Sequence, residues 1–77
     1  MKYRAQYSVM GVDYSGSGTI LFSADNDVQA QTKARERVAQ KQESRNQGMK
    51  SGFDKETFEL SSLVRIIQEE ISEPVPI

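Results

Sequence analysis

Polar and apolar residues alternate along the first part of the chain. In residues 2–10 an apolar residue follows every polar one, and residues 19–24 repeat this pattern with Ile20 and Phe22 on one side. A period of two is typical of a strand with one buried face. The intervening residues 11–18, GVDYSGSG, contain three glycines. We therefore expect two strands joined by a hairpin loop.

The pattern changes to a helical one in the middle of the chain. Ala30, Ala34 and Val38 recur at every fourth position and form a narrow apolar stripe. The small alanine side chains would let a helix lie close to a sheet. The acidic and amide residues of DND, at 25–27, are good helix caps and suit the positive end of the helix dipole. The sequence predicts a helix over residues 27–47.

Residues 56–69, ETFELSSLVRIIQE, are compatible with two structures. Phe58 and Leu60 alternate with polar residues, as in a strand, whereas the apolar residues after position 62 also fit a helical period. The segment is rich in β-branched residues and is needed to complete the sheet. We predict a third strand with a bulge at Ser61 and Ser62, and a helix is the alternative.

These elements predict a small α+β domain with the order β-β-α-β. Short connections would give a three-stranded antiparallel sheet of order 2-1-3 with one helix packed on one face. Residues 1–71 would form this single domain, and residues 72–77, which contain two prolines, an extended C-terminal tail. The expected core consists of Tyr7, Val9, Ile20, Phe22, Ala34, Val38, Phe58 and Leu60.

Composition narrows the chemistry. The chain has 77 residues and contains neither Cys nor His, which removes disulfides, thiolate or imidazole metal ligands and most nucleophile–base pairs. A domain of this size seldom has a concave site of ~300 Å³ or more. We expect no enzyme activity, no catalytic residues, no metal and no cofactor. No apolar run approaches ~18 residues, so a soluble, cytoplasmic protein with no membrane contact is expected.

Charge is segregated along the chain, although the formal net charge is only −1. Positive residues gather in the predicted helix, where Arg37, Lys41 and Arg45 follow one another at intervals of four. Such a row could bind phosphates, but no aromatic residue lies between positions 23 and 52, and the pI is near 5.3. Long side chains covering the edge of a thin core are the favoured interpretation. Weak nucleic-acid binding by these three residues is the alternative function.

The sheet face turned away from the helix is the other candidate site. Strand alternation is expected to place Leu21, Leu63 and Ile67 there, together with Arg65. Aliphatic side chains mixed with charges are typical of a contact surface. We therefore predict a small non-catalytic protein-interaction module, of the adaptor or inhibitor type, that docks through its open sheet face or edge. The partner is another protein of unidentified kind, or a second copy in a homodimer.

Overall fold

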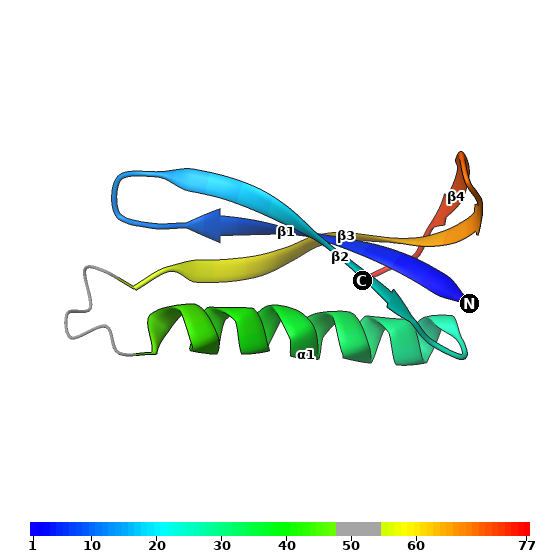
Figure 1. Cartoon of the computed structure of the whole chain (residues 1–77), viewed down its shortest axis with the longest axis horizontal. Coiled ribbons are helices and arrows are strands. Elements are labelled where there is room, and N and C mark those ends of the chain that lie inside the picture. Colours follow the sequence, from blue (N-terminus) through cyan, green and yellow to red (C-terminus); the bar gives the residue numbers. More distant parts are fainter. Residues whose placement is uncertain (48–54) are drawn as a thin grey trace.

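The structure is a computed structural model that describes residues 1–47 and 55–77. One sheet and one helix make up these residues (Figure 1). The elements are, in chain order, β1 (Lys2–Met10), β2 (Ser15–Ser23), α1 (Asp27–Asn46), β3 (Thr57–Gln68) and β4 (Ile71–Pro74). The strands form an antiparallel sheet of order β2-β1-β3-β4, and α1 lies along one face, over β3 and β1. The predicted α+β fold is confirmed, with the order 2-1-3 extended by a fourth strand.

Strand β4 is the element that the sequence pattern did not predict. Pro74 lies opposite Val64, and Ser72 lies opposite Ile66, so the chain pairs with β3 where an extended tail was expected. Val75 follows this strand and is buried, with its N–H donating to the carbonyl of Leu63 at 2.7 Å. A proline is tolerated here because β4 is an edge strand. Part of the segment 72–77 therefore belongs to the sheet and the core.

Helix α1 begins and ends close to the predicted positions. Asn26 is its N-cap, and the side chain of Asn26 accepts a hydrogen bond from the N–H of Gln29 at 2.8 Å. Asp27 in the first turn and Arg45 in the last turn both suit the helix dipole. The three buried residues of the helix are those of the predicted stripe: Ala30, Ala34 and Val38.

The pairing of β1 with β3 contains the predicted bulge. Gln6 lies opposite Ser62 and Tyr7 lies opposite Leu60, so Ser61 is an extra residue without a partner. An extra residue reverses the alternation of side chains between the two faces. Leu63 is consequently 1% exposed in the core beneath α1, and its predicted place on the open face was wrong.

Arg65 was misplaced for the same reason. It lies opposite Tyr3, which is fully buried on the helix face, and paired residues share a face. The Arg65 guanidinium reaches Asp27 at the start of α1 at 3.3 Å and also bonds Glu73 of β4. The hydrogen bond to Glu73 and the charge of Asp27 raise the pKa of Arg65. Arg65 therefore connects the helix to β4 on the helix side of the sheet.

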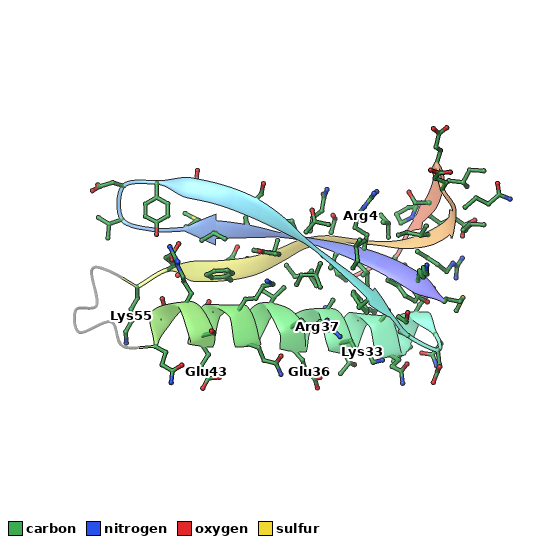
Figure 2. The ribbon with its side chains drawn as sticks, viewed as in Figure 1. Arg4, Lys33, Glu36, Arg37, Glu43 and Lys55 are labelled. Carbon is green, nitrogen blue, oxygen red and sulfur yellow. The ribbon has the colours of Figure 1, made fainter. Side chains whose placement is uncertain are left out.

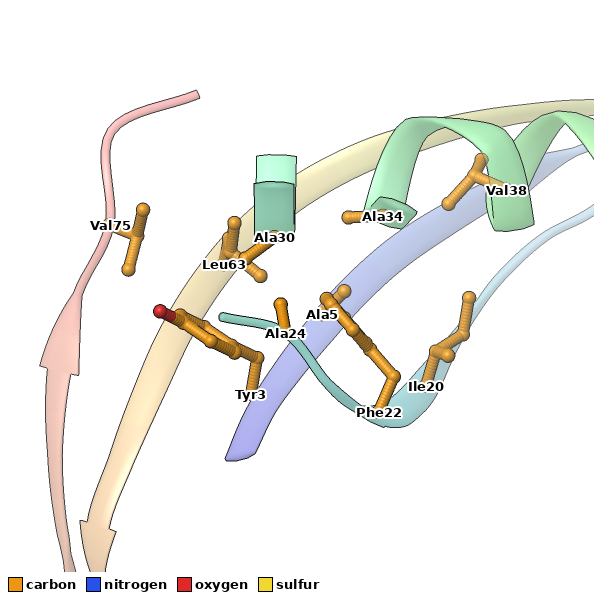
Figure 3. Close-up of a cluster of buried hydrophobic side chains, with 10 residues drawn as sticks. All are labelled: Tyr3, Ala5, Ile20, Phe22, Ala24, Ala30, Ala34, Val38, Leu63 and Val75. Carbon is orange, nitrogen blue, oxygen red and sulfur yellow. The ribbon is translucent and has the colours of Figure 1, made fainter. Parts of the chain in front are cut away.

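The core lies nearer the N-terminus of β1 than the sequence suggests (Figure 3). Tyr3 and Ala5 are fully buried, whereas Tyr7 is only partly buried, because it lies opposite Gly18, which has no side chain to cover it. A Cβ at Gly18 would overlap the Tyr7 phenol, so a larger residue there would displace the Tyr7 side chain. The core consists of Tyr3, Ala5, Ile20, Phe22, Ala24, Ala30, Ala34, Val38, Leu63 and Val75, with Tyr7, Phe58 and Leu60 packed against it.

Candidate protein-interaction site

The open face of the sheet is less apolar than expected. One row across the four strands is Leu21, Arg4, Val64 and Pro74. Arg4 points away from the helix in the middle of this row (Figure 2), between Leu21 and Val64. Leu21 is 67% exposed and is the predicted interaction residue that lies on this face. The apolar side chains are therefore divided by charge and do not form one continuous patch.

The aliphatic residues that β3 contributes to this face are Val64 and Ile66, which the sequence reasoning missed. Both lie after the bulge and take the place expected for Leu63 and Ile67. Ile67 is 49% exposed, at an irregularity where β3 pairs with β4. The bulge at Ser61 was predicted, but its effect on the later residues was not carried through. A consistent count of alternate positions from the bulge would have found Val64 and Ile66.

The outer edge of β3 near its start is covered by polar side chains of α1. The Asn46 side chain donates to the carbonyl of Glu56 at 2.9 Å and accepts from its N–H at 2.8 Å. Gln42 accepts from the N–H of Phe58 at 2.9 Å. These amides satisfy the backbone groups that a neighbouring strand would otherwise use. Because β4 pairs with the far end of β3, both ends of this edge are occupied.

The buried carboxylate of Glu56 strengthens the same edge. It is 5% exposed and forms an ion pair with Arg45 at the end of α1. Hydrogen bonds from the Tyr14 hydroxyl and then from Arg45 hold the pKa of Glu56 below its ordinary value. The bond to Glu56 in turn raises the pKa of Tyr14 and of Arg45. The carboxylate thus joins the β1–β2 turn to the helix end.

The outer edge of β2 is different, because no strand of the described sheet pairs with it. Met1 and Ala24 exchange both of their backbone hydrogen bonds, at 2.9 and 3.0 Å. In an antiparallel ladder such pairs alternate, so the N–H and C=O groups of Leu21, Thr19 and Ser17 point outward from β1. At one end, Lys33 Nζ donates to the carbonyl of Ser23 at 2.9 Å. The free part of this edge extends from Leu21 toward the hairpin.

Strand β2 lacks the residues that usually protect an edge. Its sequence, SGSGTILFS, contains no charged residue and no proline. Gly16 and Gly18 leave the helix side of the strand without side chains over half its length. The uncharged, glycine-containing edge was visible in the sequence. The exposure of this edge was not visible in the sequence, because exposure depends on which strand lies at the edge of the sheet.

A groove runs between this edge and α1. It has a volume of about 420 Å³ and is lined by Thr19, Ile20, Leu21, Arg37, Gln40, Lys41 and Ser44. A second hollow of about 580 Å³ adjoins it at Lys41 and Ser44 and reaches Tyr7 of β1 and Phe58 of β3. The first hollow follows the helix side of β2, whereas the second lies between α1 and the strands β1 and β3. Side chains of a strand placed beside β2 would have room in the first hollow.

The predicted nucleic-acid residues do not form one phosphate-binding row. The Arg37 guanidinium lies 5.8 Å from the centre of the Phe22 ring, and Lys41 Nζ lies 5.7 Å from the centre of the Tyr7 ring. Arg45 lies beside Lys41 along the second hollow, but its guanidinium is engaged in the ion pair with Glu56. Long side chains thus cover the edge of the core, as the favoured interpretation of the helix had it. Arg37 and Lys41 line the groove beside β2.

Other kinds of site have little support in the described ranges. Residues 1–47 and 55–77 contain no group of three or more acidic, His or Cys side chains that could hold a metal ion. Among the same residues, α1 lacks the run of apolar residues that a membrane-spanning helix requires. Comparison with known protein families, curated proteins and solved structures gives no match. The geometry of the described residues is therefore the basis on which a function is proposed.

Proposed function

We propose that this protein is a non-catalytic interaction module that binds an extended segment of another protein as an added strand along β2. The uncovered edge of β2 is the observation that carries this proposal. Alternate residues of β2 direct both donors and acceptors outward, which is the pattern that an added strand pairs with. The adjoining groove supplies space for the side chains of that segment.

The open sheet face supports docking less well than this edge. Its row of Leu21 and Val64 is interrupted by Arg4, and Leu63 is buried beneath the helix. Burying Arg4 against a partner would require a matching negative group. At the edge, by contrast, main-chain hydrogen bonds provide affinity without a particular side chain, and pockets beside the edge provide specificity.

A proline at Thr19 tests the proposed function. The N–H of Thr19 points outward, and its side chain lies on the open face opposite Gln6. Thr19→Pro removes the outward donor while leaving the bonds between β1 and β2 in place, as edge strands permit. Thr19→Val is the matched control because it keeps the N–H and a β-branched side chain of similar size. Circular dichroism of both variants verifies that they fold.

The binding assay uses a displayed library of random peptides as long as β2. Peptides selected on the wild-type chain are expected to bind Thr19→Val and to lose binding to Thr19→Pro. Amide chemical shifts on peptide addition are expected to change along Ser15–Ser23. Equal binding to both variants, or shift changes centred on Arg4 and Val64, would contradict strand addition at β2.

A further inference from the structure

We propose that the segment bound along β2 is acidic, with carboxylates at alternate positions facing α1. This inference rests on the proposed function, since it names the chemistry of the added strand. Three cations, Lys33, Arg37 and Lys41, lie on the flank of α1 that faces β2. Of the three acidic residues of the helix, Glu36 and Glu43 point away from the sheet (Figure 2), and Asp27 is paired with Arg65. The flank is thus positive, without a carboxylate of the helix to neutralise it.

The spacing of these cations matches that of an added strand. Residues four apart in a helix are separated by about 6 Å along its axis. Alternate residues of a strand are separated by about 6.6–6.8 Å and point to the same face. Successive carboxylates on one side of an added strand would therefore meet Lys33, Arg37 and Lys41 in turn. Such a match over three positions favours an extended chain with a two-residue repeat.

The cations are held in place without being neutralised. Arg37 and Lys41 lie over the rings of Phe22 and Tyr7, and an aromatic face attracts a cation but carries no net charge. Within the described ranges the salt bridges involve Arg45 and Arg65, and none includes Lys33, Arg37 or Lys41. The apolar floor of the groove includes Ile20 and, beneath Arg37, the Phe22 ring, which stacks on the buried Tyr3. A low-dielectric floor strengthens attraction to a carboxylate.

A second copy of the chain fits this edge less well. Two β2 strands paired antiparallel about a two-fold axis would place both helices on the same face of a continuous sheet. The rows containing Arg37 and Lys41 would then face each other, and like charges in juxtaposition oppose binding. Nucleic acid also fits less well, because phosphate oxygens only accept hydrogen bonds and cannot satisfy the outward C=O groups of β2. The acidic peptide satisfies both the edge and the charges.

Two peptides of the length of β2 test the inference. One has Glu at alternate positions with Thr and Val between them, and the other has Gln in place of each Glu. At low salt, isothermal titration is expected to show about tenfold tighter binding of the Glu peptide, which corresponds to two surface ion pairs of ordinary strength. The difference is expected to shrink as salt is added, because screening weakens exposed ion pairs.

The matched variants each remove two positive charges. Arg37→Gln/Lys41→Gln is expected to lose most of the preference for the Glu peptide, because Lys33 remains, while still binding the Gln peptide. Arg35→Gln/Lys55→Gln changes the net charge equally at exposed positions outside the residues that line the groove, and it is expected to keep the preference. Loss of the preference in both double variants would indicate a general charge effect. It would overturn the proposal that Arg37 and Lys41 recognise an acidic segment.

The remaining outcomes separate the two proposals. If both peptides bind equally and both are lost in Thr19→Pro, strand addition stands and the acidic partner is overturned. If neither peptide binds, the acidic segment is overturned, and if the peptide library also yields no binder, the proposed function fails with it. Two further results would overturn the acidic segment as occupant. One is tight binding of a short single-stranded oligonucleotide that depends on Arg37 and Lys41, and the other is a sedimenting dimer that dissociates in Thr19→Pro.

Discussion

The two edges of this sheet differ in how their backbone groups are satisfied. At the β3 edge, Asn46 and Gln42 of the helix bond the backbone of Glu56 and Phe58, and β4 covers the other end. At the β2 edge, the described contact from the helix is the bond from Lys33 to Ser23. The helix presents amides to the first edge and cations to the second. Helix side chains close the first edge near the start of β3, and β4 closes its far end.

This difference indicates why one edge is a candidate site and the other is not. An open edge can pair with another chain, and natural proteins usually block such edges with charge, proline or a covering element. The side-chain amides of Asn46 and Gln42 block the β3 edge, because they form hydrogen bonds that a neighbouring strand would otherwise form. The β2 edge keeps its donors and acceptors and adds positive charge beside them. The same helix thus covers part of one edge, and in our proposal its cations prepare the other edge for an anionic partner.

Truncation of the Leu63 side chain should have the largest effect on stability, because this side chain packs in the core beneath α1. Leu63 of β3 is only 1% exposed. Leu63→Ala is therefore expected to lower the free energy of unfolding by ~2–5 kcal/mol. Leu21→Ala is the matched control, because Leu21 is 67% exposed and should change stability by less than ~0.5 kcal/mol. Urea unfolding followed by circular dichroism measures both. Similar losses for the two variants would show that the bulge does not reverse the alternation.

The next test of the difference between the two edges is to open the β3 edge. Asn46→Ala removes both bonds to the Glu56 backbone and is expected to cost ~1–3 kcal/mol, because partly buried polar groups lose their partner. Gln40→Ala, on the β2 flank of the same helix, is expected to change stability by less than ~0.5 kcal/mol. Faster amide exchange at Glu56 and Phe58 in Asn46→Ala alone would confirm the local opening. Unchanged amide exchange at Glu56 and Phe58 would mean that the Asn46 side chain does not protect this edge.

Acidification should weaken the closed edge more gradually. Hydrogen bonds from Tyr14 and Arg45 lower the pKa of Glu56, so its ionised form stabilises the folded state above the unfolded pKa of about 4.3. This contribution is lost as the pH falls through the lower pKa of the folded state. Urea midpoints measured from neutral pH downward should therefore fall in that window.

The variant Glu56→Gln isolates this contribution. It should be less stable than wild type at neutral pH, and the difference should narrow on acidification because the wild-type carboxyl becomes neutral too. Glu59→Gln removes an exposed carboxylate nearby and is expected to keep the wild-type pH dependence. A constant difference between Glu56→Gln and wild type at all pH values would contradict a role for the ionised carboxylate.

The local patterns of the sequence were sufficient for most elements. Alternation predicted β1 and β3, the alanine stripe and the DND cap predicted α1, and the serine pair predicted the bulge. Each of these depends on residues close together in the chain, where periodicity and capping act directly. β2 begins earlier than expected, at Ser15, because Gly16 and Gly18 pair with Val9 and Tyr7 although glycine is a weak strand former.

The tertiary structure alone decided which surfaces are open. The bulge changes the face of every later residue of β3, so Leu63 and Arg65 are on the helix side and Val64 and Ile66 are on the other. Strand β4 forms because β3 offers an edge and the core accepts Val75, neither of which periodicity reveals. The covering of one edge by Asn46 and the uncovered edge of β2 arise from contacts between residues distant in the chain. Local patterns specify strands and helices, whereas long-range packing determines which backbone groups remain available to a partner.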